Sequence, residues 1–205
     1  CQRGVYSDDK SSLDLSNAHL AAGDAATIAL WLKGNGVLKN IDLRGNSLGT
    51  EGWCAIFAAL RDNKENKIES WHLSGQGINT EIAKVLAEYV SVSGVLKTLN
   101  LYNNQIRAEG AAAIAEALRG NGVLTDLSLC NNNIGPKGGV AIGKALAVNG
   151  VLKKLNLSFN KIGPKGAAAI AEGLRGNRVL TKLDLGANKI DDEGATALAS
   201  ALEVN

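Results

Sequence analysis

The feature that most constrains this chain is a repeat: four consecutive segments of 28, 28, 28 and 27 residues share one pattern. They begin at Val95, Val123, Val151 and Val179. A fixed period of this length is typical of a structure in which one small unit is stacked many times. Such a unit buries its apolar side only against its neighbours, so the chain is predicted to form one elongated stack.

Each unit is predicted to contain a strand, a turn and a helix. In the first of the four, the pattern L-x-x-L-x-L-x-x-N-x-I places Leu99 and Leu101 two residues apart, which is the spacing of one face of a strand. From Gly110 to Leu118 the pattern is G-A-x-x-I-A-x-x-L. Its spacings of three and four place the apolar side chains on one face of a helix.

These motifs resemble the leucine-rich-repeat family, and specifically its ribonuclease-inhibitor-like class. They are also similar to the repeat regions of NOD-like receptors and Ran GTPase-activating proteins. The resemblance covers nearly the whole chain and implies an α/β horseshoe solenoid of about seven repeats, with a parallel sheet on the concave face and helices on the convex face. The spacing of the elements agrees with a horseshoe. Parallel strands stack about 4.8 Å apart and helices need about 8–10 Å, so a stack with one of each per repeat must bend, with the helices on the longer, convex side.

The motif asparagine has a separate expected role. Its amide both donates and accepts hydrogen bonds, so it can satisfy backbone groups where the chain leaves each strand. Stacking of the repeats would align these side chains in a ladder, formed by Asn104, Asn132, Asn160 and Asn188.

The repeats are expected to form a single domain over residues 11–205, after a tail or remnant of an upstream element at residues 1–10. The repeat boundaries are predicted at about 11–37, 38–67, 68–94, 95–122, 123–150, 151–178 and 179–205. A methionine-free sequence that starts at Cys1 is typical of a processed chain or a fragment. Because terminal repeats need a polar face, we expect more repeats, a cap or a partner beside the last repeat, whose edge would expose parts of Leu183, Leu185, Ile190 and Leu198.

The second and third repeats depart from the pattern. Trp53 and Phe57 take positions that are alanine or glycine in later repeats. They either pack against small residues of the first repeat or anchor an upstream domain or partner. Trp71 stands at a core leucine position and is predicted to be buried. The spacing between these repeats grows to 30 residues, and Gln76 replaces the motif asparagine, which is expected to distort the turn.

Composition disfavours several functional classes. The net charge is only +2, with acids and bases interspersed, so there is no basic footprint for nucleic acid or an anionic membrane. No apolar run approaches about 20 residues, so no membrane span is predicted. The cysteines are few and far apart in sequence, a poor disulfide framework that favours an intracellular, cytoplasmic location; they are Cys1, Cys54 and Cys130.

Strand alternation identifies the side chains of the concave face, which lie between and just after the paired leucines. This surface is polar and mixed, and its larger groups include the residue types that dominate binding hot spots. In ribonuclease-inhibitor-like proteins the residues just after the paired leucines often touch the ligand, so the resemblance favours Tyr102 and Arg44. The residues predicted to bind a partner are Arg44, His72, Tyr102, Cys130, Lys154 and Phe159.

Nothing in the pattern points to catalysis, a cofactor or a metal. His19 and His72 are more than one repeat apart, and neither stands in a Ser-His-Asp or Cys-His arrangement. Cys130 is expected to be an exposed thiol without a nearby base. Asp14, Asp42 and His72 fall on neighbouring strands, but aspartates are common on solvated strand faces, so no metal site is predicted.

The sequence therefore predicts a non-enzymatic scaffold that binds a protein partner through the concave face and the adjoining loops. Two alternatives remain open: a regulator of another enzyme, such as a GTPase activator, and a structural subunit of a large assembly. The resemblance to the Ran activators lies in the repeat class only. The partner itself is not identified, because one repeat scaffold serves many functions.

Overall fold

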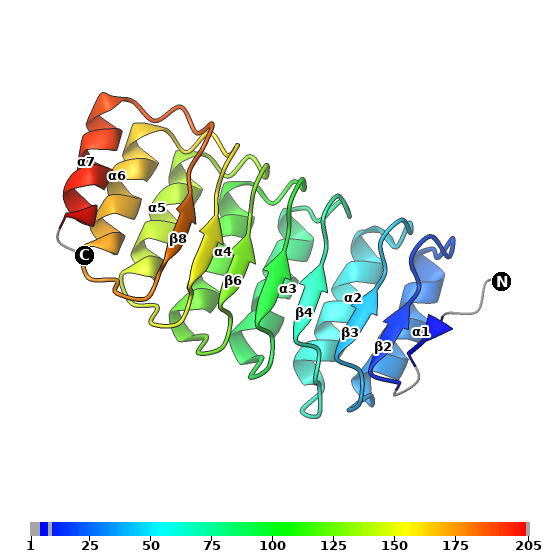
Figure 1. The fold of residues 1–205 in the computed structure, drawn as a ribbon. Helices are drawn as coiled ribbons and strands as arrows, with labels where there is room; N and C mark the ends of the chain where they lie inside the picture. Colours follow the sequence, from blue (N-terminus) through cyan, green and yellow to red (C-terminus); the bar gives the residue numbers. More distant parts are fainter. Residues whose placement is uncertain (1–4, 8–9, 204–205) are drawn as a thin grey trace.

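A computed structural model describes residues 5–7 and 10–203, where strands alternate with helices along the chain (Figure 1). The strands are β1 (Val5–Tyr6), β2 (Ser12–Asp14), β3 (Asn40–Asp42), β4 (Ser70–His72), β5 (Thr98–Asn100), β6 (Asp126–Ser128), β7 (Lys154–Asn156) and β8 (Lys182–Asp184). The helices are α1 (Ala22–Lys33), α2 (Gly49–Asp62), α3 (Thr80–Val92), α4 (Arg107–Gly120), α5 (Gly135–Leu146), α6 (Gly163–Leu174) and α7 (Asp192–Leu202).

The strands form one sheet in chain order, with β2 to β8 parallel (Figure 1). Corresponding residues of neighbouring repeats lie opposite each other, as Leu99 and Leu127 do. All the helices cover the same side of the sheet. The predicted α/β horseshoe of about seven strand-turn-helix repeats is thus confirmed for the described residues.

The first strand lies in the segment that fits no repeat. β1 pairs antiparallel with β2, with Val5 opposite Asp14 and Tyr6 opposite Leu13. These two residues therefore extend the sheet by one strand beyond β2. Cys1 lies outside the described residues.

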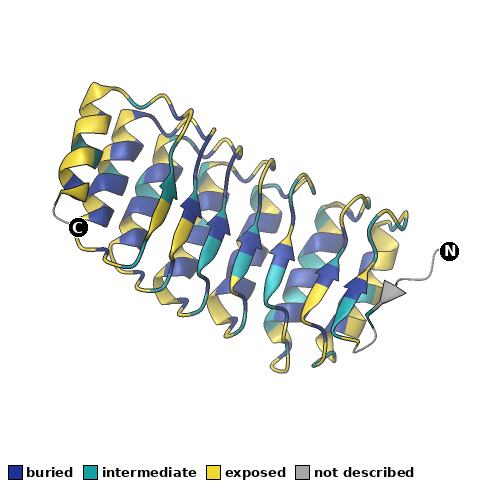
Figure 2. Cartoon of the chain, in the orientation of Figure 1, coloured by how far each residue is buried: buried dark blue, intermediate teal, exposed yellow. Residues whose placement is uncertain are grey.

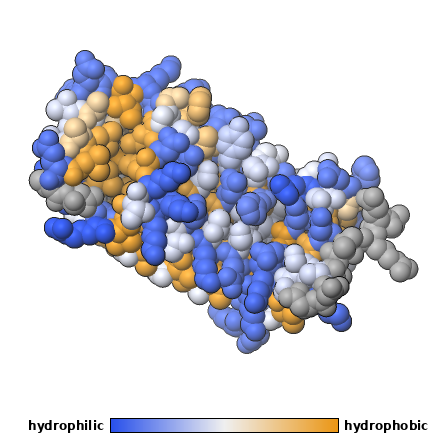
Figure 3. All heavy atoms as spheres, viewed as in Figure 1, coloured by the Kyte–Doolittle hydropathy of each residue, from blue (hydrophilic) through white to orange (hydrophobic). Residues whose placement is uncertain are grey.

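The core is a continuous layer between the sheet and the helices, seen as the dark inner faces of both in Figure 2. Each inner repeat contributes the same set of buried side chains, such as Leu127, Leu129, Ile134 and Ile142 of the fifth repeat. A helix face of period 3.6 and a strand face of period 2 thus meet in one apolar layer. At the last repeat this layer is partly exposed, as predicted, at Leu183, Leu185, Ile190 and Leu198. The same end of the molecule shows a broad hydrophobic patch in Figure 3.

The motif asparagines form the predicted ladder. Asn132 is fully buried, and its Nδ2 donates to the carbonyl oxygens of Leu101 in the preceding repeat (2.8 Å) and Leu129 in its own (3.1 Å). Its Oδ1 accepts from the backbone N–H of Ile106, and its own N–H donates to Oδ1 of Asn160. Asn132 thus joins its repeat to both neighbours.

A second asparagine ladder, which the sequence analysis did not identify, runs along the opposite edge of the stack, where each helix ends and the chain leads into the next strand. Asn121 follows α4, and its Nδ2 donates to the carbonyl oxygens of Val90 (2.7 Å) and Ser93 (3.3 Å) in the preceding repeat. Its Oδ1 accepts from the backbone N–H groups of Val123 and Leu124. The same bonds recur at Asn149 and Asn177. These residues end each helix and also join it to the helix before.

Helices α5 and α6 approach each other closely because each carries a glycine at the contact. A Cβ atom added at Gly143 would lie 2.2 Å from the carbonyl oxygen of Ala169, and one added at Gly173 would lie 2.1 Å from that of Gly143. Distances of this kind are too short for any side chain, so the glycines set how close the two helices pack.

The stack is irregular between the second and third repeats, and we call this boundary the seam. Only Asn40 and Ser70 pair across it, whereas the other parallel neighbours share three pairs each. Gln76 donates only to the carbonyl of Ser74 in its own repeat, so the asparagine ladder is interrupted at this position. At the opposite edge of the stack, Ser93 stands where the second ladder has asparagine, and its Oγ accepts from the backbone N–H of Leu96 at the start of the fourth repeat.

A cluster of aromatic rings fills the seam. Phe57 stacks on Trp53 with ring centroids 5.5 Å apart and meets the edge of Trp71 at 5.8 Å. It also stacks on Tyr89, whose hydroxyl accepts from Asn66 in the longer loop. All four rings are buried, so the anchor interpretation of Trp53 and Phe57 is wrong and the predicted burial of Trp71 is confirmed. The rings contact the third repeat, ahead of them in the stack.

Candidate partner-binding surface

The side of the sheet opposite the helices is the concave face, and its side chains flank the buried leucine of each strand (Figures 1 and 2). In β7 these are Lys154 and Asn156, on either side of Leu155. Because the strands are parallel and in register, equivalent side chains of successive repeats stand in rows about 4.8 Å apart. The six predicted binding residues are distributed over five repeats, on this surface and in the loops that lead from the strands to the helices.

Arg44 lies on the concave face and is held by its own repeat. Its guanidinium binds Asp42, with Nε 3.0 Å from each carboxylate oxygen. This hydrogen bond holds the pKa of Asp42 below its usual value, against the raising effect of partial burial. The same contact raises the pKa of Arg44. The pair leaves half of the arginine side chain accessible to a partner.

His72 lies beside this pair, on the far side of the seam. It is exposed, and its Nε2 is 3.3 Å from Oγ of Ser70 in the same strand. Asp14 and Asp42 are opposite each other in the sheet, as predicted. Among the described residues no group of three or more His, Cys, Asp or Glu side chains is placed to hold a metal ion.

Tyr102 projects from the turn after β5 with 47% of its surface exposed. Its backbone N–H donates to Oδ1 of Asn100, which fixes the turn at the end of the strand. Next to it, Asn103 accepts a hydrogen bond from Nδ2 of Asn131 in the following repeat (2.9 Å). The tyrosine ring thus stands on a rigid, hydrogen-bonded edge.

Cys130 differs from its prediction as an exposed thiol. It is only 8% exposed, and its sulfur lies within hydrogen-bond distance of Oγ of Ser158 in the next repeat (3.1 Å). The thiol is therefore shielded from a partner on the concave face.

Phe159 is the most unusual residue of the surface. It is 62% exposed, and its backbone has a left-handed φ of 57°. The other repeats place Asn, Gly or Ala at this point of the turn: Asn17, Gly45, Gly75, Asn103, Asn131 and Ala187. Asparagine and glycine tolerate a positive φ, whereas a bulky aromatic residue there is an outlier. The energetic cost of that conformation is not recovered by burial of the ring.

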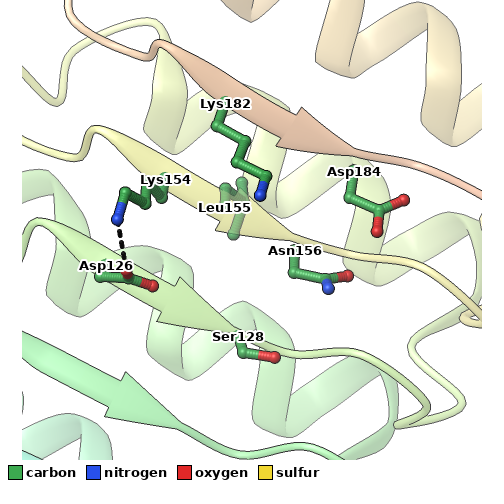
Figure 4. A pocket seen from close by; sticks show the side chains of 7 residues that line it. All are labelled: Asp126, Ser128, Lys154, Leu155, Asn156, Lys182 and Asp184. Atoms are coloured by element: carbon green, nitrogen blue, oxygen red, sulfur yellow. Dashed lines mark ion pairs between the residues drawn. The ribbon is translucent and has the colours of Figure 1, made fainter.

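Lys154 belongs to a pocket of about 280 Å³ that opens on the concave face across β6, β7 and β8 (Figure 4). Its Nζ is 3.4 Å from a carboxylate oxygen of Asp126 on the preceding strand. Lys182 occupies the equivalent position on β8, and Figure 4 shows it extending over Leu155 toward Asn156. The lining residues are Asp126, Ser128, Lys154, Leu155, Asn156, Lys182 and Asp184.

Sequence reasoning selected Lys154 but missed Asp126 and Lys182 as its neighbours in this pocket. The signal was available, because all three immediately precede the inward leucine of their strands. A search restricted to the positions between and after the paired leucines passes over this row.

None of the helices in the described residues has the length and apolar character needed to cross a membrane. The described cysteines, Cys54 and Cys130, are both free thiols.

Comparison with known proteins agrees with this geometry. A family model described as "Leucine Rich repeat" matches residues 95–115, 120–143, 148–171 and 176–199. The chain is similar to a solved structure described as "Leiomodin-1 Actin-Binding Site 2 (ABS2)", with 26% identity and a TM-score of 0.61, over 72% of this chain and 86% of that one. The curated proteins include no match. With its parallel strands, buried leucines and asparagine ladder, this chain is a leucine-rich-repeat protein.

Proposed function

We propose that this chain is a protein-interaction scaffold that binds a protein partner through its concave face and the adjoining strand-to-helix loops. The observation that carries the proposal is Phe159, a large apolar side chain that is mostly exposed on a left-handed backbone. Such a conformation costs about 1–3 kcal/mol and persists where the surrounding structure holds it in place, often at functional sites. A contact made by the ring would offset this cost.

Tyr102 supports the same surface. It lies two strands away from the Phe159 repeat, so the strand spacing sets the two aromatic positions about 10 Å apart along the stack. Exposed aromatic residues of this kind dominate the energies of protein interfaces. Arg44 and His72 extend the surface toward the N-terminal repeats and add charged and hydrogen-bonding groups.

The scaffold suits binding because it is already ordered. Both asparagine ladders fix neighbouring repeats to each other through buried hydrogen bonds. A preordered surface loses little conformational entropy on association, so more of the contact energy remains as affinity. We infer that the chain acts by this complementarity and not by turnover.

Actin is the first partner to test, because the similar solved structure is described as an actin-binding site. If actin does not bind, affinity capture followed by mass spectrometry would supply a candidate for purification. The binding constant would then be measured with the purified partner.

The decisive variant combines Tyr102→Ser with Phe159→Asn. We expect it to weaken binding at least tenfold while the fold is retained. The matched control combines Val92→Ser with Val148→Ser, which removes two similarly exposed apolar side chains from the helical side of the molecule. Equal affinity of the wild type and the concave-face variant would contradict the proposal.

A further inference from the structure

We propose that the pocket across β6, β7 and β8 binds a carboxylate group of the partner polypeptide. This inference rests on the proposed function and specifies what the partner must present. It is argued from the hydrogen-bonding groups that the pocket leaves unused, from its charge balance and from its position relative to Phe159.

The pocket collects donors that have no acceptor among the described residues. Among the described residues Lys182 makes no ion pair, and the neighbouring Asp184 accepts the backbone N–H of Gly186 at one of its oxygens (2.9 Å). Ser128 lines the same pocket, and its hydroxyl makes no hydrogen bond within the described part of the chain. Polar groups that converge on one small hollow and remain unpaired are a feature of binding sites.

Asn156 adds a donor whose orientation is fixed. Its Oδ1 accepts from both the backbone N–H (2.9 Å) and the hydroxyl (2.7 Å) of Ser158. The amide nitrogen must therefore be the other atom, and its two hydrogens have no acceptor among the described residues. A carboxylate is an acceptor-only group and would complement an ammonium, an amide and a hydroxyl at once.

The lining of the pocket carries no net charge, so a singly charged group is accommodated at a lower electrostatic cost than a doubly charged one. Two lysines, Lys154 and Lys182, are set against Asp126 and Asp184. The ion pair between Lys154 and Asp126 is exposed and 3.4 Å long, and pairs of this kind contribute only about 0–1 kcal/mol. Lys154 is thus free to turn toward a ligand. The flanking aspartates would repel a doubly charged phosphate more strongly than a carboxylate.

The pocket and Phe159 belong to the same strand and turn. Asn156 and Phe159 are three residues apart, so their Cα atoms lie no more than about 10 Å from each other. An extended partner segment could therefore contact the phenylalanine ring with an apolar residue and place a carboxylate in the pocket two or three residues away.

The test is a nuclear magnetic resonance titration of the ¹⁵N-labelled chain with short peptides. The first has a central glutamate with both termini blocked, and the second replaces that glutamate with glutamine. The third has no acidic residue but a free C-terminal carboxylate, and the fourth carries phosphoserine in place of glutamate. The first and third distinguish a side-chain carboxylate from a terminal one.

We expect the glutamate or the free-terminus peptide to shift the amide signals of Ser128, Asn156 and Lys182, with affinity that falls at least threefold when salt is raised from about 0.05 M to 0.5 M. The glutamine peptide should leave these signals unchanged. Equal shifts with glutamate and glutamine, or tighter binding of phosphoserine than of either carboxylate, would overturn the proposal.

A matched pair of variants locates the effect. Lys182→Gln should lower the affinity for the carboxylate peptide at least fivefold. Lys144→Gln, which changes an exposed lysine on α5, should leave that affinity unchanged. Retained peptide binding by Lys182→Gln would contradict the assignment.

The two proposals fail in different ways. If the Tyr102 and Phe159 variant no longer binds the purified partner while Lys182→Gln still binds the carboxylate peptide and the partner fully, the scaffold proposal is retained and the pocket proposal is rejected. If the peptide binds in the pocket but the Tyr102 and Phe159 variant binds the purified partner with unchanged affinity, only the proposed aromatic binding surface is rejected.

Discussion

The ring of Phe57 in the second repeat stacks on that of Tyr89 in the third, with centroids 6.4 Å apart and planes inclined by 9°. Backbone pairing is sparse at this boundary, where only Asn40 and Ser70 lie opposite each other in the sheet. Side-chain packing therefore replaces the strand hydrogen bonds that join the other repeats. Apolar area is non-directional, so it can fill a boundary that a two-residue insertion has made irregular.

Removal of the central ring should uncouple the first two repeats. Phe57→Ala is expected to cost about 3–5 kcal/mol, because the ring is fully buried. Hydrogen exchange should show the first two repeats losing protection at lower denaturant than the rest. The exposed control Val92→Ala should change stability by less than about 0.5 kcal/mol. Simultaneous loss of protection throughout the chain would contradict this prediction.

The ladder position at the seam, Gln76, should contribute less stability than a regular ladder position, Asn132. Asn132→Ala leaves the carbonyls of Leu101 and Leu129 and the N–H of Ile106 without their partner, so we expect a loss of about 3 kcal/mol or more. Gln76→Ala removes one bond within its own repeat and should cost less than about 1 kcal/mol. Urea unfolding of both variants measures the difference, and similar losses would show that the ladder is not the source of stability.

Gly143 offers a case in which helix propensity and packing predict opposite signs. Alanine is favoured over glycine in a helix by about 1 kcal/mol. A Cβ atom at this position would lie 2.2 Å from the carbonyl oxygen of Ala169, so Gly143→Ala should instead destabilise by about 1–3 kcal/mol. Gly120→Ala is the control, because no atom lies within 4 Å of the added carbon. Thermal unfolding should show a lower midpoint for the first variant only.

Phe159 should show a trade between stability and binding. Phe159→Asn relieves the left-handed strain and should raise the free energy of unfolding by about 1 kcal/mol. The same change should weaken the partner complex. Asn131→Phe is the reciprocal variant at the equivalent turn and should be destabilising by at least as much, because it also removes the hydrogen bond to Asn103. A loss of stability in Phe159→Asn would mean that the ring has a structural role.

The pair formed by Asp42 and Arg44 should be visible in titration. The arginine lowers the pKa of Asp42 from its ordinary value near 3.8, so the pair contributes stability above that pH and loses it as pH falls through the lowered value. Arg44→Gln should move the pKa of the carboxyl back up. Carbon-detected resonance titration of Asp42 measures both, and an unchanged pKa in the variant would contradict the assigned cause.

Much of this architecture can be predicted from the spacing of the leucines. The paired leucines, the helix face and the asparagines at position nine of the motif are local patterns with a fixed period, so they identify the strands, helices and first ladder. The second ladder was harder to foresee. A helix followed by Gly-Asn or Val-Asn already explains a helix end, and the bond from Asn121 back to Val90 depends on how the helices stack.

The concave surface could likewise be predicted only in part. Alternation places Tyr102, Arg44 and Phe159 on the concave face, but it does not report whether a side chain turns outward. Cys130 is buried because the hydroxyl of Ser158 in the next repeat covers it. The pocket depends on residues from three consecutive repeats, with Asp126 opposite Lys154 and Lys154 opposite Lys182. Contacts between copies of a motif do not appear in the motif itself.

The glycine contact between α5 and α6 also affects the shape that a partner meets. Strand spacing is nearly constant, so the local curvature of the arc depends on how far apart successive helices stand. Gly143 and Gly173 let two helices pack closely behind the pocket, whereas four bulky rings fill the seam between the second and third repeats. We therefore expect the concave face to be flatter beside Phe159 and more sharply bent beside His72, so that a partner would be selected by its outline as well as its charge.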